Sequence, residues 1–138
     1  MSSISKLEFL QEYGSAKHKK SIPDIAGKMI DHGDEDVADH IANSEVKLHS
    51  HHIHKLIHME RSDGFMPPAG YVGRYRKLDD EHWDAIAKHK NPRVVTENLG
   101  KMPLKHLKTV ANSTHLDSMI RGIAASEYRH KKSAGYPE

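Results

Sequence analysis

The sequence contains no cysteine, and this absence excludes disulfide bonds, thiolate zinc sites and cysteine nucleophiles. Long hydrophobic runs are also missing. The opening residues, MSSISKLEFLQEYG, lack the apolar run of about 7–15 residues that a secretory signal needs, and no stretch approaches membrane-spanning length. We therefore expect a protein without a membrane partner that resides in the cytoplasm or in a virion.

The chain has little excess charge of either sign. Its 21 basic and 19 acidic residues leave a formal charge of +2, whereas a nucleic-acid-binding protein usually carries a concentrated basic face. Histidine, by contrast, is abundant, with 13 copies. Protonating all of them near pH 6.5 would raise the net charge to about +15, so we expect the protein to be sensitive to acid.

Strand-like alternation is nearly absent, and apolar residues recur three and four positions apart as they do in helices. The best strand candidate, Arg93–Thr96, follows an asparagine and a proline that are typical of a helix start. Similar start signals recur at short intervals, at Ser21 with Asp24, Asp34, Asn91 with Pro92, Pro103, and Thr114 with Asp117. The pattern predicts an all-α fold of about seven or eight short helices.

One helical pattern occurs four times. EHWDAIA (Glu81–Ala87) is matched by KHLKTVA (Lys105–Ala111), and HHIHKLI (residues 51–57) and DIAGKMI (residues 24–30) fit the same frame. A second short helix is expected after three of the four, within residues 34–44, 91–101 and 116–126. The periods of 24 to 30 residues indicate repeated helical hairpins.

The segment His82–Ser126 resembles degenerate HEAT-like repeats of the kind found in uncharacterised bacterial and bacteriophage proteins. The resemblance implies a small α-solenoid of about three to four hairpins, whose usual use is to hold another macromolecule. The arginine that commonly follows the valine of the second helix is missing, since Ala38 and Val95 occupy that position. The resemblance therefore concerns architecture and carries over no catalytic residue.

At 138 residues the chain has the length of one domain, and we expect residues 1–138 to form a single helical-repeat domain. Within it, an irregular loop is expected at residues 61–80, where several glycines and prolines oppose a regular helix. A basic, flexible tail is expected at residues 128–138.

Five of the ten residues in HSHHIHKLIH (His49–His58) are histidine. On a helix, Ile53, Leu56 and Ile57 would form the buried stripe, and three histidines would lie on the opposite face. Three neutral imidazoles can form a surface site for zinc, copper or nickel, but a solvent-exposed face that happens to be rich in histidine explains the pattern as well. The metal ligands of the first alternative would be His51, His54 and His58.

His82 and His106 occupy equivalent positions in the repeat, next to large apolar residues. Repeat-equivalent residues are usually structural, so we expect both rings to pack at a hairpin joint with one nitrogen bonded to a nearby carbonyl. No nucleophile elbow, phosphate-binding loop or dinucleotide fingerprint is present in the sequence. We therefore expect a protein that is not an enzyme and that needs no cofactor.

The irregular loop interrupts the repeats, and such departures often carry function. Its aromatic and basic residues are of the types enriched at protein–protein hot spots, which makes a protein the expected partner. The alternative is that Phe65, Met66 and Tyr71 cover the core face that the missing helix leaves open. The predicted contact residues are Phe65, Met66, Tyr71, Arg74, Tyr75, Arg76 and Lys77.

Nucleic acid is the alternative partner. Basic residues cluster near residue 18 and in the tail, and together with the loop they could form one phosphate-binding surface. The residues of this surface would be Lys17, Lys19, Lys20, Arg74, Arg76, Arg129, Lys131 and Lys132. The leading prediction is a non-enzymatic interaction or assembly module, of bacteriophage type by resemblance.

Overall fold

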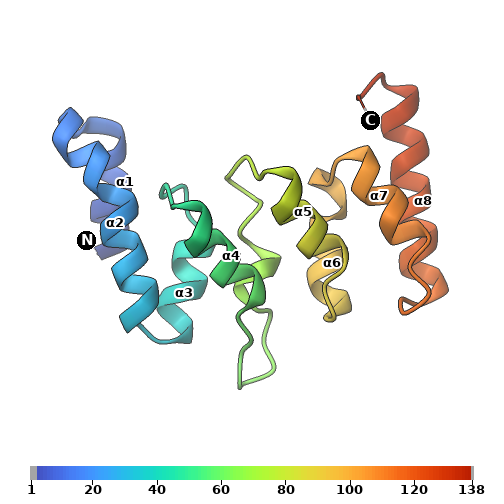
Figure 1. Cartoon of the computed structure of the whole chain (residues 1–138), viewed down its shortest axis with the longest axis horizontal. Helices are drawn as coiled ribbons and strands as arrows, with labels where there is room; N and C mark the ends of the chain where they lie inside the picture. The colour runs from blue at the N-terminus through green and yellow to red at the C-terminus, as the bar shows by residue number, and fades with distance from the viewer. Residues whose placement is uncertain (1–2, 138) are drawn as a thin grey trace. The chain divides into compact units, whose positions relative to one another are not determined.

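The computed structural model describes residues 3–137, and within them it is all-helical (Figure 1). Eight α-helices and two single-turn 3₁₀ segments occur in this range, and no strand does. The all-α prediction is confirmed, and the strand candidate Arg93–Thr96 lies inside a helix. Among the described helices, none has the length and apolar character required to cross a membrane.

The described chain divides after Lys77 into two compact units. Unit 1 contains α1 (Ser3–Tyr13), α2 (Ala16–His32), α3 (Glu35–Ala42), α4 (Ser50–His58) and the 3₁₀ turn η1 (Pro68–Gly70). Unit 2 contains α5 (Asp80–Ala87), α6 (Pro92–Asn98), the 3₁₀ turn η2 (Leu99–Lys101), α7 (Leu104–Ala111) and α8 (Ser118–Ser133). The helix α8 thus extends into the segment that we expected to be a flexible tail.

Two of the predicted helix starts are confirmed by side-chain caps. The Asp34 carboxylate accepts a hydrogen bond of 3.0 Å from the backbone N–H of Val37, and the Asn91 side chain accepts one of 3.0 Å from Arg93. Pro92 is the first residue of α6, as predicted. Local sequence decides these starts because each cap bonds a group only two or three residues away.

Two other predicted starts are wrong. Ser21 lies inside α2, which begins five residues earlier with Ser15 as its N-cap. Pro23 is also inside this helix, and burial of Ile22 next to it stabilises the helix in spite of the missing N–H. The last helix begins at Ser118, where Asp117 is the cap, and not after Thr114. In both cases a second capping residue nearby proved to be the true start.

The buried stripes fall where the repeat frame placed them. In α4, Ile53, Leu56 and Ile57 are buried while His54 and His58 are exposed. In α5 and α7 the buried residues include Trp83 and Leu107 at equivalent positions. Only the first copy departs from the frame, because Ile25 is 41% exposed. The period of 3.6 residues therefore predicted most of the core faces.

In unit 1, α4 runs parallel to α2, and polar pairs join them along their length. The Nε2 atom of His49 lies 2.6 Å from Asp24, that of His52 lies 3.3 Å from Asp31, and Lys55 donates to Asp31 at 2.6 Å. The hydrogen bond from Lys55, followed by the one from His52, lowers the pKa of Asp31. The His52 ring is buried against α2, so this pairing fixes the register between the two helices.

Unit 2 repeats the arrangement with α5 and α7. Lys105 and the Nε2 atom of the buried His106 both lie 2.9 Å from Asp80, at the start of α5. The bond from Lys105, followed by that from His106, lowers the pKa of Asp80. His82 is also buried and faces Asp79. The buried positions of His82 and His106 fit the structural role predicted for them, but the partner of the His106 ring is a carboxylate rather than the backbone carbonyl that we expected.

Gly27 provides a test of the contact between α2 and α4. A Cβ atom at this position would overlap Cε1 of His52 and lie 2.6 Å from its Nδ1. Alanine normally favours a helix interior over glycine by about 1 kcal/mol. We nevertheless expect Gly27→Ala to destabilise the protein by about 1–3 kcal/mol, because His52 must leave its place. Urea denaturation measures the change.

Gly122 is the matched control for this experiment. It also lies inside a helix, α8, but nothing lies within 4 Å of a Cβ placed there. Gly122→Ala should therefore stabilise the protein by about 0.5–1 kcal/mol. If Gly27→Ala stabilised the protein to the same extent, the close packing of His52 on α2 would be refuted.

Candidate functional site

The segment that follows α4 in unit 1, residues 59–77, is the candidate site, and it will be called the connecting segment. It contains no α-helix, and its only regular element is the 3₁₀ turn η1. Two arginines, Arg61 near its start and Arg76 near its end, hold it against the two ends of α3. The segment is therefore irregular in backbone but fixed in place.

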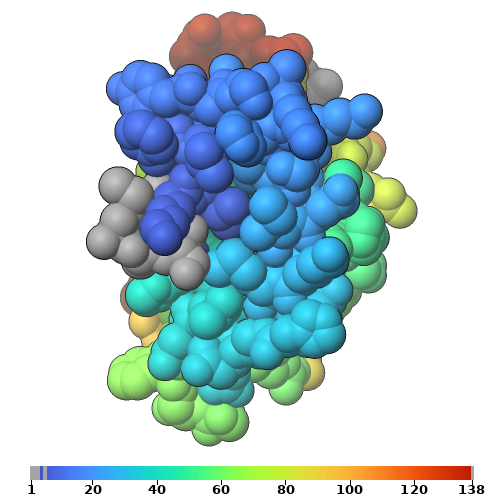
Figure 2. All heavy atoms as spheres, turned by 90° about the vertical axis from the view of Figure 1, so that its left-hand side faces the viewer, coloured from blue at the N-terminus to red at the C-terminus, as the bar shows by residue number. Residues whose placement is uncertain are grey.

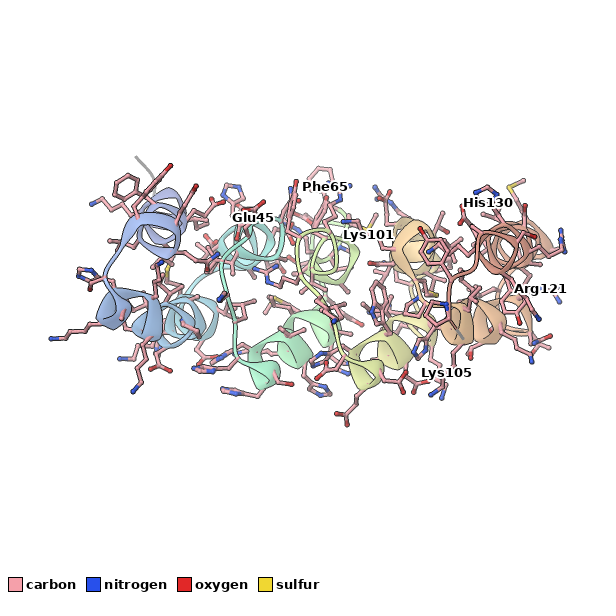
Figure 3. All side chains as sticks on the ribbon, turned by 90° about the horizontal axis from the view of Figure 1, so that it is seen from above. Glu45, Phe65, Lys101, Lys105, Arg121 and His130 are labelled. Atoms are coloured by element: carbon pink, nitrogen blue, oxygen red, sulfur yellow. The ribbon has the colours of Figure 1, made fainter. Side chains whose placement is uncertain are left out.

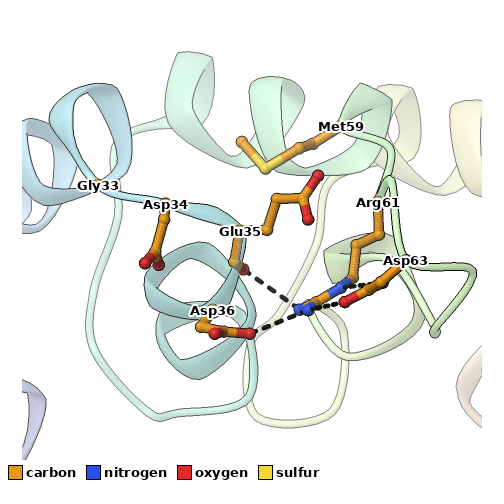
Figure 4. A pocket seen from close by; sticks show the side chains of 7 residues that line it. All are labelled: Gly33, Asp34, Glu35, Asp36, Met59, Arg61 and Asp63. Carbon is orange, nitrogen blue, oxygen red and sulfur yellow. Dashed lines mark hydrogen bonds and ion pairs between the residues drawn. The ribbon is translucent and has the colours of Figure 1, made fainter.

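Arg61 fixes the first part of the segment. Its guanidinium, 8% exposed, donates to Asp36 at 2.9 Å and pairs with Asp39 and Asp63 as well. Beside it, Glu35 accepts hydrogen bonds of 2.9 and 3.1 Å from the backbone N–H and the hydroxyl of Ser62. The acidic first turn of α3 thus binds the Arg61 guanidinium and the neighbouring residue Ser62 (Figure 4).

The pKa values of two of these carboxyl groups are shifted by burial and by their contact with Arg61. The Arg61 guanidinium lowers the pKa of Asp63 to about 2. The pKa of Asp39 is raised, because burial outweighs the opposing hydrogen bond from Arg61, and its Oδ1 atom has no hydrogen-bond partner. Among the described residues, Arg61 is thus the group that compensates the charge of Asp39.

An open pocket of about 540 Å³ lies at this first turn of α3. Its acidic residues are already engaged within unit 1: Asp34 caps the helix, Glu35 binds Ser62, and Asp36 and Asp63 bind Arg61. The pocket is lined by Gly33, Asp34, Glu35, Asp36, Met59, Arg61 and Asp63. The chemistry of these groups accounts for the position of the connecting segment without a ligand.

The middle of the segment fills the core. Met66 is 4% exposed and lies over Gly70, where a Cβ would come within 2.6 Å of its Cγ. Ala69 and Val72 are completely buried, and η1 packs against both α3 and α4. Met66 therefore takes the place of a helix side chain in the core, which was the alternative role proposed for it, and it does not lie on the surface.

Arg76, which is half-buried, fixes the end of the segment. Its guanidinium donates to the carbonyl oxygens of Ile41 at 2.7 Å, Ala42 at 2.8 Å and Val46 at 2.7 Å. The first two belong to the last turn of α3, whose carbonyls have no partner within the helix. Burial lowers the pKa of Arg76 to about 10, so that it stays charged at neutral pH and complements the negative end of the helix dipole.

Six of the seven predicted contact residues keep some exposure, and apart from the half-buried Arg76 they form two groups. Phe65 is 69% exposed, points away from the chain (Figure 3) and lies near Arg61 at the start of α3. Tyr71, Arg74, Tyr75 and Lys77 lie toward Arg76 and the other end of that helix, and we call them the Tyr/Arg surface. Since eight helical residues span about 12 Å, Phe65 and the Tyr/Arg surface are separate features.

Within the Tyr/Arg surface the side chains support one another. The Arg74 guanidinium lies 5.2 Å from the centre of the Tyr71 ring, in the arrangement of a cation–π contact. Tyr75 is 52% exposed, and the backbone N–H of Arg74 bonds the carbonyl of Tyr71 at 3.0 Å in a tight turn. Next to this turn, Arg76 donates hydrogen bonds to the carbonyls of Ile41, Ala42 and Val46, so the surface is anchored to the end of α3.

The residues of the predicted phosphate-binding surface are divided between the units. Lys17, Lys19 and Lys20 are exposed in the first turns of α2, whereas Arg129, Lys131 and Lys132 lie in α8. Lys131 donates to the carbonyl of Met102 at 3.0 Å, and burial lowers its pKa. Binding of nucleic acid stays a prediction, and the guanidinium of the half-buried Arg76 is already bonded to backbone carbonyls.

The histidine face of α4 separates into two groups. The rings of His54 and His58 are 4.4 Å apart, whereas the ring of His51 lies 4.1 Å from that of His52. In residues 3–137, no three His, Asp or Glu side chains are arranged to hold a metal ion. A metal site at His51, His54 and His58 stays a prediction, with His54 and His58 as the adjacent pair.

No family model, curated protein or solved structure matches the chain.

Proposed function

We propose that the protein is a non-enzymatic interaction module, a short α-solenoid of HEAT-like hairpins that binds a protein partner through the Tyr/Arg surface. The observation that carries the proposal is the exposed turn of Tyr71, Arg74 and Tyr75, which Arg76 fixes to the end of α3. Tyrosine and arginine combine large contact area with hydrogen bonding, and a surface that is already ordered loses little entropy on binding.

The arrangement of helices within each unit supports the solenoid. In unit 1 the parallel helices α2 and α4 flank α3 in sequence, and in unit 2 α5 and α7 flank α6. Each parallel pair is joined by a buried histidine and a carboxylate, His52 with Asp31 and His106 with Asp80. Parallel first helices separated by a second helix are the pattern of stacked helical hairpins.

The test is recovery of a partner by variants of the exposed residues. We expect the wild-type protein to recover a discrete protein from a lysate of its native host or of infected cells, with and without nuclease. Arg74→Ala/Tyr75→Ala should reduce recovery at least tenfold while circular dichroism stays unchanged, because both side chains are exposed. The capture tag should not rely on nickel, in view of the 13 histidines.

Phe65→Ala is the matched control, because it removes an exposed aromatic residue near the opposite end of α3. It should recover the partner as the wild-type protein does. Equal loss in both variants, or none in Arg74→Ala/Tyr75→Ala, would refute the Tyr/Arg surface. If the recovered material disappeared on nuclease treatment, the partner would be nucleic acid and not protein. Lys17, Lys19 and Lys20 would then be the residues to substitute next.

A further inference from the structure

Both joints between parallel helices place the same position of the repeat frame against the preceding helix. In the frame shared by DIAGKMI, HHIHKLI and KHLKTVA, the second residue of α4 is His52 and that of α7 is His106. His52 and Lys55 both reach Asp31 of α2. His106 reaches Asp80 of α5 in the same way. In each joint, the preceding helix thus supplies a carboxylate to the side chains that face it.

The corresponding positions of α2 have no parallel helix of the described chain against them. The second residue of its frame is Ile25, which is 41% exposed, and Lys28 holds the position that Lys55 has in α4. The helix before it, α1, packs elsewhere, because its buried Leu7 shares a core cluster with Ile22 on another side of α2. The place that α2 fills beside α4 is therefore open beside α2 itself.

An open groove of about 410 Å³ lies at this place, between α2 and the start of α3. Figure 2 shows the face of unit 1 on which these two helices are exposed. The lining combines three apolar side chains with two basic ones. The residues of the groove are Ile25, Lys28, Met29, His32, Gly33 and Val37.

The carboxylates around the groove are already engaged, whereas its basic groups are not. Asp24 and Asp31 bind side chains of α4, Asp34 caps α3, and the acidic first turn of α3 binds the connecting segment. Within residues 3–137, the side chains of Lys28 and His32 have no ion pair or hydrogen bond. A carboxylate brought into the groove would therefore meet Lys28 without displacing an internal pair.

A second copy of this chain does not continue the stack with the required charge. The last parallel helix, α7, has Asn112 and Leu104 at the frame positions that Asp31 and Asp80 hold in α2 and α5. In addition, α7 packs against α8. The helix that fits the groove of α2 must therefore bring a carboxylate that α7 lacks.

We propose that the groove binds an amphipathic helix of a partner protein, with apolar side chains against Ile25 and Met29 and a carboxylate on Lys28. The two internal joints are the template for this contact, because each shows a helix with an aspartate bonded to the side chains in front of it. The proposal does not rest on the Tyr/Arg surface, since none of the groove residues belongs to it.

The test uses a peptide copied from α5, the helix that occupies this place beside α7. The peptide comprises residues 78–88, with a hydrocarbon bridge in place of Glu81 and Ala85 because so short a helix does not form alone. Labelled with fluorescein, it should bind the protein with a Kd on the order of 100 µM in fluorescence polarisation. The peptide with Asp80→Asn/Asp84→Asn should bind at least about threefold more weakly.

Substitutions in the protein locate the peptide. Lys28→Glu should weaken binding at least about tenfold, and Ile25→Ser should weaken it as well. A peptide with Asp80→Lys/Asp84→Lys should bind Lys28→Glu better than the original peptide does, because the charge pair is reversed. Lys20→Glu is the matched control: it makes the same change on the same helix outside the groove and should bind as the wild-type protein does.

Four results would overturn the proposal. These are no binding up to about 1 mM protein, equal binding of the Asp80→Asn/Asp84→Asn peptide, equal loss in Lys20→Glu and Lys28→Glu, or loss in Arg74→Ala/Tyr75→Ala alone, which would place the peptide on the Tyr/Arg surface. Sedimentation velocity adds a fifth, since self-association that Lys28→Glu abolishes would make a second copy the occupant. Circular dichroism confirms that each variant is folded.

Discussion

Arg76→Ala should destabilise the protein by about 3 kcal/mol, the largest effect that we expect from any single substitution. The guanidinium donates to the carbonyl oxygens of Ile41, Ala42 and Val46 at 2.7–2.8 Å. The substitution removes this donor from all three, and among the described residues only the Ile41 carbonyl keeps a second one, the hydroxyl of Ser44 at 2.7 Å. Each carbonyl that stays buried without a partner costs about 1–3 kcal/mol. Urea denaturation monitored by circular dichroism measures the loss.

Two further variants make this result specific. Arg74→Ala removes the same side chain two residues earlier, where it is exposed, and should change the stability by less than about 1 kcal/mol. Arg76→Lys should be intermediate, because one ammonium group cannot reach all the carbonyls that the planar guanidinium reaches. Equal stability of Arg76→Ala and Arg74→Ala would contradict the role assigned to Arg76.

Arg61→Ala should lower the melting temperature by roughly 5 °C or more. The substitution removes the cation that pairs with Asp36, Asp39 and Asp63. Asp39 suffers most, because it is the most buried of the three and burial already raises its pKa. Asp39→Asn in the Arg61→Ala background removes this unpaired charge and should recover part of the loss. A double variant no more stable than Arg61→Ala would refute this explanation.

The cost of Arg61→Ala should also depend on pH. In the wild-type protein the pKa of Asp63 is lowered to about 2, below its usual range, so its pairing stabilises the fold above about pH 4 and is lost as the pH falls toward 2. The variant lacks this contribution at every pH. In the variant, protonation of Asp39 removes its unpaired buried charge, and this also reduces the difference in stability between the two proteins as the pH falls. The difference in melting temperature between the two proteins should therefore shrink between pH 5 and about pH 2.

The sequence was informative where structure depends on near neighbours. The buried stripe of Ile53, Leu56 and Ile57 follows from the helical period, and the caps Asp34 and Asn91 bond groups two or three residues away. The predicted start of α2 is wrong because Ser15 and Ser21 are both acceptable caps and Asp24, three residues after Ser21, favours the later one. Packing of Ile22 in the core, which is a tertiary effect, decides between them.

The candidate site was predicted only in part, because its organising residues act over a long range. Arg76 reaches a carbonyl 35 residues away and Arg61 a carboxylate 22 residues away, distances at which the sequence gives no pairing signal. An arginine in a segment rich in glycine and proline can bind a partner at the surface or bond the protein's own backbone, and the sequence does not distinguish the two roles. The acidic first turn of α3 is the one signal that the sequence offers, and carboxylates at a helix start are explained equally well by the helix dipole.

Amide hydrogen exchange of the protein with and without the partner recovered from nuclease-treated lysate tests the central claim most directly. We predict that binding slows exchange in residues 71–77, with little change in residues 61–65 and in α8. Protection confined to α8 or to α2, with residues 71–77 exchanging as in the free protein, would contradict the account and move the binding site away from the Tyr/Arg surface.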